Sequence, residues 1–182
     1  STQGWINTMD STSNVRGATF MVATGGTITT CGNDKIHTFT GPGTFTVNCA
    51  ASGAANNLVS YMVVAGGGGS VSDRGGAGGA GGFREVKSPA TPYTASPLDG
   101  YPSAPNRITV TATSFPITVG AGGTGDSSPP LTVGGNGADS VFSTITSTGG
   151  GGGGRTPVAG ANGGSGGGGG CAAGSGNTPP VS

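Results

Sequence analysis

The sequence contains little charge. Charged residues make up 8% of the 182 residues, and the formal net charge is zero. Binding to nucleic acid needs a basic surface that displaces counterions from phosphates, so this composition does not predict a nucleic-acid partner. Disordered chains usually carry a high net charge that keeps them solvated. The neutral composition therefore favours an ordered fold.

Large apolar residues are also scarce. Leu, Ile, Val and Phe together contribute 29 of the 182 residues, a content low enough to be typical of disordered chains. No apolar stretch approaches the roughly 20 residues that a membrane-spanning helix needs, so no membrane insertion is expected. The first residues, STQGWINTMD, have neither a basic start nor an apolar stretch and do not predict a signal peptide. We expect a segment of a larger protein with a small conventional core.

Cysteine is rare, with three residues in the chain. Cys31 and Cys49 could form a disulfide, but the hairpin register predicted below places Lys35, not Cys31, opposite Cys49. A disulfide requires Cα atoms within about 7 Å, which only a folded-back turn after Cys31 would allow. A disulfide and buried free thiols are the two alternatives.

Residues that would carry chemistry are few and scattered. The sequence has a single histidine, His37, and no CxxC or HxxxH spacing, so it predicts no metal site. The acidic residues lie singly, and no nucleophile motif such as GxSxG accompanies the histidine. We therefore expect a protein that is not an enzyme and that binds no cofactor.

Two glycine-rich segments imitate nucleotide-binding motifs. Residues 120–125 read GAGGTG and match GxGxxG, but the dinucleotide motif opens a helix, and the next five residues, which end in Pro129-Pro130, cannot begin a long one. Residues 149–156 imitate a P-loop with Arg155 in place of the phosphate-binding lysine. Neither segment predicts a nucleotide site.

Glycine is abundant, with 42 residues, and its placement is regular. Three runs directly follow β-like segments: YMVVA leads into residues 66–69, FPITV into residues 120–125, and VFSTITST into residues 149–154. A further block at residues 163–170 has no strand before it. A flexible linker gives no reason for β-branched residues before each run, so the pattern indicates a structural repeat.

Short strands are expected between the glycine runs. Candidates are residues 20–23, 27–30, 108–112 and 115–119, Val133 and residues 141–145. Residues 35–47 predict a hairpin around Gly41-Pro42-Gly43 that pairs Phe39 with Phe45. Residues 57–65 are mostly apolar, which is typical of a strand buried on both faces. No segment has the apolar stripe of an α-helix.

Glycine runs can form structure only through their backbone. Fixing one residue costs about 1–2 kcal/mol, and a hydrogen bond returns about 1 kcal/mol. Glycine helices of the polyproline II type make no internal bonds, but several side by side can bond to one another. Collagen is excluded because glycine does not recur at every third position. Flexible linkers remain the alternative, and we expect the most C-terminal runs to be the most mobile.

The expected fold is therefore all-β, with a small β-sandwich or hairpin core, packed polyglycine II helices and essentially no α-helix. Residues 1–17 are expected to form an arm or linker, residues 18–65 a β-hairpin region, and residues 66–182 a glycine-rich domain with interleaved strands. Replacing Gly151 with Val should disrupt this fold if the helices pack against one another, since a Cβ would block their approach.

Exposed aromatic residues are the best binding candidates. Residues 84–107 form a Pro-rich excursion that contains Tyr93 and Tyr101. Arg84 and Arg107 bound it, and Tyr and Arg are frequent anchors of interfaces. Alternatively, the tyrosines pack this loop onto the domain.

The order of motifs resembles a known group of proteins. IHTFTGPGTFTV, SYMVVAGGGG, GGAGGFREVKSP, TPYTASPLDGYP, FPITVGAGG and SVFSTITSTGGGGGG together resemble glycine-rich virion proteins predicted in marine bacteriophages, notably those infecting cyanobacteria. This resemblance covers roughly residues 20–182. A looser similarity is to the tip adhesins of T-even-like phages, in which polyglycine II helices form a sandwich and loops at one end bind host receptors.

The resemblance implies a non-enzymatic virion protein in a tail fibre or other surface appendage. It would act outside the cell, in a homo-oligomer or with other virion proteins, and display loops to a host-surface glycan or protein. The alternative is a self-assembling extracellular filament or capsid-decorating protein with an architectural role. A tail-spike enzyme acting on carbohydrate is a third class, and it would require two carboxylates in one cleft.

Overall fold

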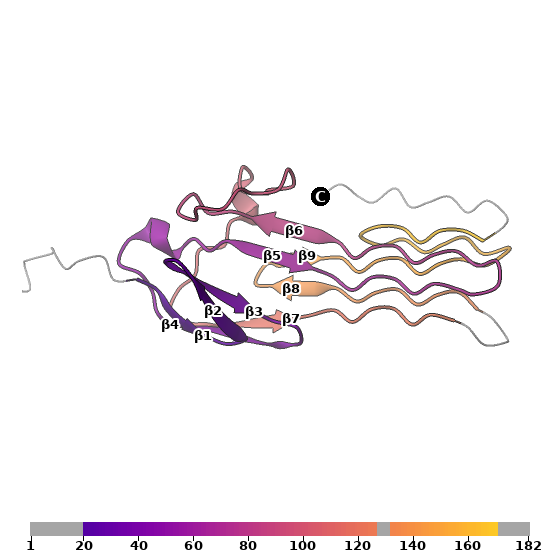
Figure 1. The fold of residues 1–182 in the computed structure, drawn as a ribbon, viewed down its shortest axis with the longest axis horizontal. Coiled ribbons are helices and arrows are strands. Elements are labelled where there is room, and N and C mark those ends of the chain that lie inside the picture. The colour runs from indigo at the N-terminus through magenta and orange to yellow at the C-terminus, as the bar shows by residue number, and fades with distance from the viewer. Residues whose placement is uncertain (1–19, 127–131, 171–182) are drawn as a thin grey trace, which may run out of the picture.

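The computed structural model describes residues 20–126 and 132–170, and the predicted arm at residues 1–17 lies outside this part of the chain. The described chain is all-β. Its strands gather at one end of an elongated molecule, and the glycine runs extend side by side to the other end (Figure 1). Helical structure in these residues is confined to two short 3-10 turns, Ala54–Asn57 and Ala104–Asn106.

Three antiparallel sheets make up the strand end. The largest has the order β1-β4-β7-β8-β9, and the pairs β5-β6 and β2-β3 form the other two. The main-sheet strands are β1 (Val22–Thr24), β4 (Gly43–Cys49), β7 (Ser114–Thr118), β8 (Ser140–Phe142) and β9 (Ile145–Ser147). The remaining strands are β2 (Thr27–Cys31), β3 (Asp34–Thr38), β5 (Tyr61–Val64) and β6 (Phe83–Val86).

A small apolar core lies between these layers. Phe142 of β8 is at its centre, with ring centroids 6.1 Å from Phe45, 6.0 Å from Tyr61 and 6.2 Å from Phe115. Aliphatic residues complete the cluster: Val47, Val63, Ile108, Val110 and Ile145. Contacts between the edge of one ring and the face of another stabilise the core in addition to the effect of burying apolar area. The structure thus has the small sandwich core that the composition predicts.

The predicted hairpin over residues 35–47 is wrong. β3 pairs with β2 around the turn Gly32-Asn33, where Gly32 has a φ of +58°, and β4 pairs with β1 and β7. Phe45 and Val47 alternate with more exposed residues along β4. Burying this apolar face requires β4 to join the main sheet, which a local hairpin with β3 would not achieve.

Four other strand predictions also need correction. Residues 57–65 are not buried on both faces, because Met62 is 67% exposed and Val64 is 50% exposed. Residues 108–112 form no strand, although Ile108 and Val110 are buried. Val133 lies in a glycine-rich run. The predicted segment 141–145 is divided between β8 and β9 by a turn at Ser143, whose φ is +54°.

Both predictions for the cysteines are wrong as well. Cys31 and Cys49 are free and exposed, so they form neither a disulfide nor buried thiols. Cys31 ends β2 at the hairpin turn, opposite Asp34, and Cys49 ends β4 opposite Val22. The two thiols belong to separate sheets. The prediction depended on pairing of β3 with β4, whereas β3 pairs with β2.

Seven glycine-rich runs extend beyond the strands (Figure 1). We number them in chain order as runs 1 to 7: residues 66–70, 75–82, 120–126, 132–139, 148–154, 159–164 and 165–170. Run 1 continues from β5 and run 2 returns to β6, run 3 continues from β7 and run 4 returns to β8, and run 5 continues from β9. The order of the strands therefore determines where runs 1 to 5 begin or end.

Hydrogen bonds between the runs recur every three residues. The N–H groups of Gly68 in run 1 and of Val71, the residue after this run, donate to the run 2 carbonyls of Gly79 and Gly76, at 2.8 and 3.2 Å. The same spacing recurs between run 5 and each of runs 1, 2 and 4. Three residues are one turn of a polyproline II helix. The runs are thus polyglycine II helices that bond to one another, as predicted.

Run 5 lies at the centre of this bundle. Its residues 149–154 are all buried. Their N–H groups donate, in chain order, to Asp139, Gly66, Ser165, Asn136, Gly69 and Gly168. Every carbonyl from residue 148 to 154 accepts an N–H from run 2, 4 or 6. The backbone of run 5 is fully paired, as buried backbone must be, so run 5 is packed and not a free linker. The expected mobility of the most C-terminal runs stays a prediction.

Close contact between the runs explains why glycine is required inside the bundle. A Cβ on Gly151 would lie 1.9 Å from the carbonyl oxygen of Ala161, closer than real Cβ atoms approach. At the surface the constraint disappears, because the atom nearest to a Cβ on Gly122 would be the Gly67 carbonyl oxygen at 3.7 Å. Alanines occur where a side chain points outward, as at exposed Ala77 and Ala80, three residues apart in run 2.

Candidate binding site

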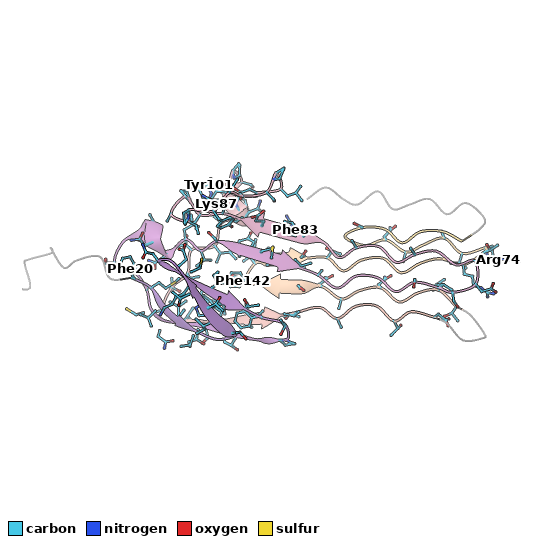
Figure 2. All side chains as sticks on the ribbon, in the orientation of Figure 1. Phe20, Arg74, Phe83, Lys87, Tyr101 and Phe142 are labelled. Carbon is cyan, nitrogen blue, oxygen red and sulfur yellow. The ribbon has the colours of Figure 1, made fainter. Side chains whose placement is uncertain are left out.

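A charged cleft lies at the end of the bundle far from the strands. It is an open depression of about 330 Å³, lined by Asp73, Arg74, Arg155 and Thr156. Arg74 belongs to the turn between runs 1 and 2, and Figure 2 shows it at the extreme end of the molecule. Arg155 and Thr156 belong to the turn that follows run 5. We refer to these four residues as the tip cleft.

Backbone hydrogen bonds of the bundle hold the two turns together. The N–H of Gly76 donates to the carbonyl of Gly154 at 2.7 Å, two residues from Arg74 and one residue from Arg155. Gly170 of run 7 lies between the turns, since a Cβ there would be 3.0 Å from the Arg74 carbonyl oxygen and 2.8 Å from the Thr156 nitrogen. The register of the glycine helices thus positions the tip cleft.

The first of these turns has an unusual backbone. Asp73 and Arg74 have φ values of +50° and +64°, in the left-handed region that favours glycine. Asp tolerates this region better than most residues, whereas each such non-glycine residue costs about 1–3 kcal/mol. Strain of this kind is common at functional sites. The chain accepts it here although its flanking runs consist largely of glycine.

The tip cleft was not among the sites predicted from sequence. A signal for it does exist: the charged tetrapeptide VSDR interrupts residues 66–82, and RTPV follows residues 149–154. In a bundle of glycine helices that leave the strands and return to them, such interruptions mark the turns. Because residues 66–69 and 149–154 both follow strands of the same strand end, their turns meet at the same far end of the bundle.

The binding surface predicted from the sequence lies at the strand end and not at the tip cleft. It comprises Tyr93, Tyr101, Arg84 and Arg107. Arg107 is engaged in its own loop: its guanidinium carbon lies 4.3 Å from the centroid of the Tyr101 ring, and its Nε donates to the Tyr101 carbonyl at 2.7 Å. Tyr93 is 41% exposed, and the Nζ of Lys87 lies 5.8 Å from its ring centroid. Figure 2 shows Lys87 and Tyr101 at the strand end, above β6.

Arg84 lies in a second cleft beside this loop. That cleft encloses about 150 Å³ and includes Tyr61, Glu85 and Leu98 in its lining. The structure therefore places Arg84 in a cleft with Glu85, while Tyr101 and Arg107 stack on each other. The tip cleft and this second cleft each have one carboxylate in their lining, Asp73 in one and Glu85 in the other.

Two carboxylates fix the conformation of the Pro-rich loop. The Oδ1 atom of Asp99 accepts hydrogen bonds from the N–H groups of Lys87 and Tyr101, both at 3.0 Å. Oε2 of the buried Glu85 accepts the N–H and the hydroxyl of Ser96. The loop is therefore an ordered excursion.

The phenol of Tyr93 in this loop has a raised pKa. Burial raises the pKa, and the negative charge of Glu85 raises it further.

Tyr61 gives the strand end a predicted pH dependence. Its hydroxyl donates to the Asn106 carbonyl at 2.7 Å, and burial raises its pKa to about 12, against the opposing charge of Arg84. The unfolded chain releases this proton near pH 10, whereas the folded chain retains it. Tyr61 therefore contributes stability that is present below about pH 10 and is lost progressively between about pH 10 and 12.

This expectation is checked by urea unfolding between about pH 9 and 12. The free energy of unfolding of the wild type should fall more steeply with pH than that of Tyr61→Phe, which has no phenolic proton to release. If the free energy of unfolding fell with pH at the same slope in both proteins, the assignment to Tyr61 would be contradicted. This holds even if the variant is less stable at every pH, because a constant difference reports only the loss of the hydrogen bond to Asn106.

His37 has a structural role. Its ring lies edge-on to Phe45, with centroids 5.0 Å apart, and its Nδ1 donates to the Gly25 carbonyl at 2.8 Å. Within residues 20–126 and 132–170, no group of His, Cys, Asp and Glu side chains is arranged to hold a metal ion. The same residues include no helix with the length and apolar character to cross a membrane.

These features define a class of protein: a small β-sandwich extended by a bundle of mutually bonded polyglycine II helices. The sequence profile described as a glycine-rich domain matches residues 37–181, and the chain belongs to that family. Neither curated proteins nor solved structures gave a match. The matched residues include the bundle and most of the strands that carry it.

Proposed function

We propose that the chain is a non-enzymatic structural protein of a phage virion, in a tail fibre or similar surface appendage. It acts at the virion surface by presenting the turns at the end of its glycine bundle to a host-surface glycan or protein. One observation carries the proposal: glycine helices that bond to one another hold a charged cleft at the end of the molecule far from the strands. The resemblance to glycine-rich virion proteins supplies the biological setting.

The bundle suits this task because its rigidity does not depend on side chains. Residues 149–154 of run 5 alone span about 19 Å, at about 3.1 Å per residue. Preorganised turns bind with a smaller loss of conformational freedom than flexible loops. The strand end then remains available for assembly with further copies or with other virion proteins.

Competition with virion adsorption tests the proposal. Purified protein should reduce adsorption of the parent virus to its host, and a variant with Ser72, Asp73 and Arg74 all replaced by glycine should not. This variant should keep the wild-type melting temperature, because glycine suits the left-handed turn. Tyr93→Ala, at the strand end, is the matched control and should compete normally. The opposite ranking of the two variants would place attachment at the Tyr and Arg surface.

A specific observation also supports the architectural alternative. Met62 and Val64 of β5 and Phe83 of β6 are exposed apolar residues. Exposed apolar side chains of this kind suit lateral packing between copies. Electron microscopy separates the two functions: a helical polymer formed by the purified chain would favour the filament, whereas gold-labelled antibody only at the tail tips of virions would favour the appendage.

A further inference from the structure

We propose that the tip cleft binds an anionic saccharide. Its carboxylate or phosphate would lie between the guanidinium groups of Arg74 and Arg155, and its neighbouring hydroxyls would bond to the carboxylate of Asp73 and the hydroxyl of Thr156. This inference rests on the proposed function and names the class of ligand that the tip recognises. It follows from three features of the cleft: its charges, its fixed geometry and its backbone conformation.

The charges of the cleft favour an anion. Arg74 and Arg155 line one cavity together with a single carboxylate, Asp73. The nearby Asp126 is committed to its own loop, where its Oδ2 accepts the N–H and the hydroxyl of Thr132. A guanidinium has five N–H donors in a planar fork that matches carboxylate and phosphate oxygens. An Arg that contacts a neighbouring residue therefore retains donors for a ligand.

Asp73 favours a saccharide over a simple anion. A carboxylate beside two guanidinium groups lowers the affinity of the cleft for small inorganic anions, but it accepts hydrogen bonds from hydroxyl groups. Thr156 adds a hydroxyl that can donate or accept. An acidic sugar presents an anionic group and several hydroxyls within a few ångströms of each other. The four side chains match that combination.

The geometry of the cleft is fixed before any ligand binds. The hydrogen bond from Gly76 to Gly154 and the position of Gly170 between the turns hold the main chain at Arg74 close to that at Arg155. Binding then requires the ordering of side chains but not of the main chain, which lowers its entropic cost.

The backbone conformation of the first turn favours a role for its side chains. Asp73 and Arg74 occupy consecutive left-handed positions, and Gly75 follows directly. Glycine would adopt this conformation without strain. The sequence nevertheless has two charged residues at the strained positions, and both line the cleft. Their side chains contribute something that folding alone does not require.

Isothermal titration calorimetry with three probes tests the inference: trigalacturonate, the neutral sugar galactotriose and inorganic phosphate. Wild-type protein should bind trigalacturonate, and the affinity should fall as salt rises. Arg74→Gly and Arg155→Gln should each weaken this binding at least about tenfold. Arg107→Gln, which removes a guanidinium at the strand end, is the charge-matched control and should bind like the wild type.

Each outcome decides the question. Binding of galactotriose as tight as that of trigalacturonate would overturn the role of the anionic group, and phosphate binding alone would overturn the role of the sugar. Equal losses in Arg107→Gln would show a non-specific charge effect. If no probe binds while the three-glycine turn variant still fails to block adsorption, the anionic-saccharide inference fails and the proposed function stands. If trigalacturonate binds but that variant blocks adsorption normally, the proposed function fails.

Discussion

Gly151→Ala should unfold the glycine bundle, whereas Gly122→Ala should leave it unchanged. A Cβ on Gly151 would lie 1.9 Å from the Ala161 carbonyl oxygen and 2.9 Å from the Gly167 nitrogen. Relief would require runs 5 and 6 to separate. That movement would break the hydrogen bonds between these two runs, which the N–H groups of Ala161 and Gly164 donate to the carbonyls of Gly152 and Gly149.

The expected loss exceeds the 1–3 kcal/mol typical of overpacking in a core, because main-chain atoms cannot rotate away as side chains do. A domain of ordinary stability has about 5–15 kcal/mol in total, so Gly151→Ala should melt far below the wild type or fail to fold, and Gly151→Val should be worse. Thermal melting followed by circular dichroism measures the effect. Gly122→Ala is the matched control, with 3.7 Å of clearance, and equal melting of the two variants would contradict close packing around run 5.

Replacing both Asn136 and Asp139 with alanine should lower the free energy of unfolding by about 2–6 kcal/mol. Their Oδ1 atoms accept the N–H groups of Gly152 and Gly149 at 2.8 Å. These are the two N–H groups of residues 149–154 that no main-chain carbonyl accepts. Each buried N–H left without a partner costs about 1–3 kcal/mol.

Conservative variants separate the hydrogen bond from the charge. Asp139→Asn retains an Oδ1 acceptor and should lose much less stability than Asp139→Ala in urea unfolding. Asp73→Asn, at the tip, removes an equal charge without touching run 5 and should unfold like the wild type. A loss in Asp139→Asn as large as that in Asp139→Ala would show that the negative charge, and not the acceptor geometry, stabilises the central run.

The side-chain acceptors show how far sequence reasoning extends in this protein. Alternation of strand-like and glycine-rich segments predicts packed polyglycine II helices, and the structure has them. The spacing of Asn136 and Asp139 equals the three-residue repeat, as does that of Ala77 and Ala80. This spacing predicts that, in each three-residue turn of a glycine helix, one position can carry a side chain that points to solvent or to a neighbouring run. Which run would receive the two acceptors could not be read, because run 5 lies in a later part of the chain.

The errors have a common origin in long-range pairing. The hairpin over residues 35–47 has a good turn, yet β4 joins β1 and β7 because Phe45 must meet Phe115 and Phe142 from distant segments. Residues 57–65 contain enough apolar side chains for two buried faces, but the structure covers only one of them. Sequence patterns report how apolar a segment is, and the number of neighbouring layers decides how much of it is buried.

The sequence by itself determined the all-β class, the absence of a long helix in the described chain and the glycine runs that follow strands. These features depend on local properties: β-branched residues favour extended backbone, and glycine alone lacks a Cβ. Tertiary structure decided that residues 149–154 form the buried centre and that Arg74 and Arg155 share one cleft. Both results depend on which runs become neighbours, and that is set by the strand order β1-β4-β7-β8-β9 and its companion pair β5-β6.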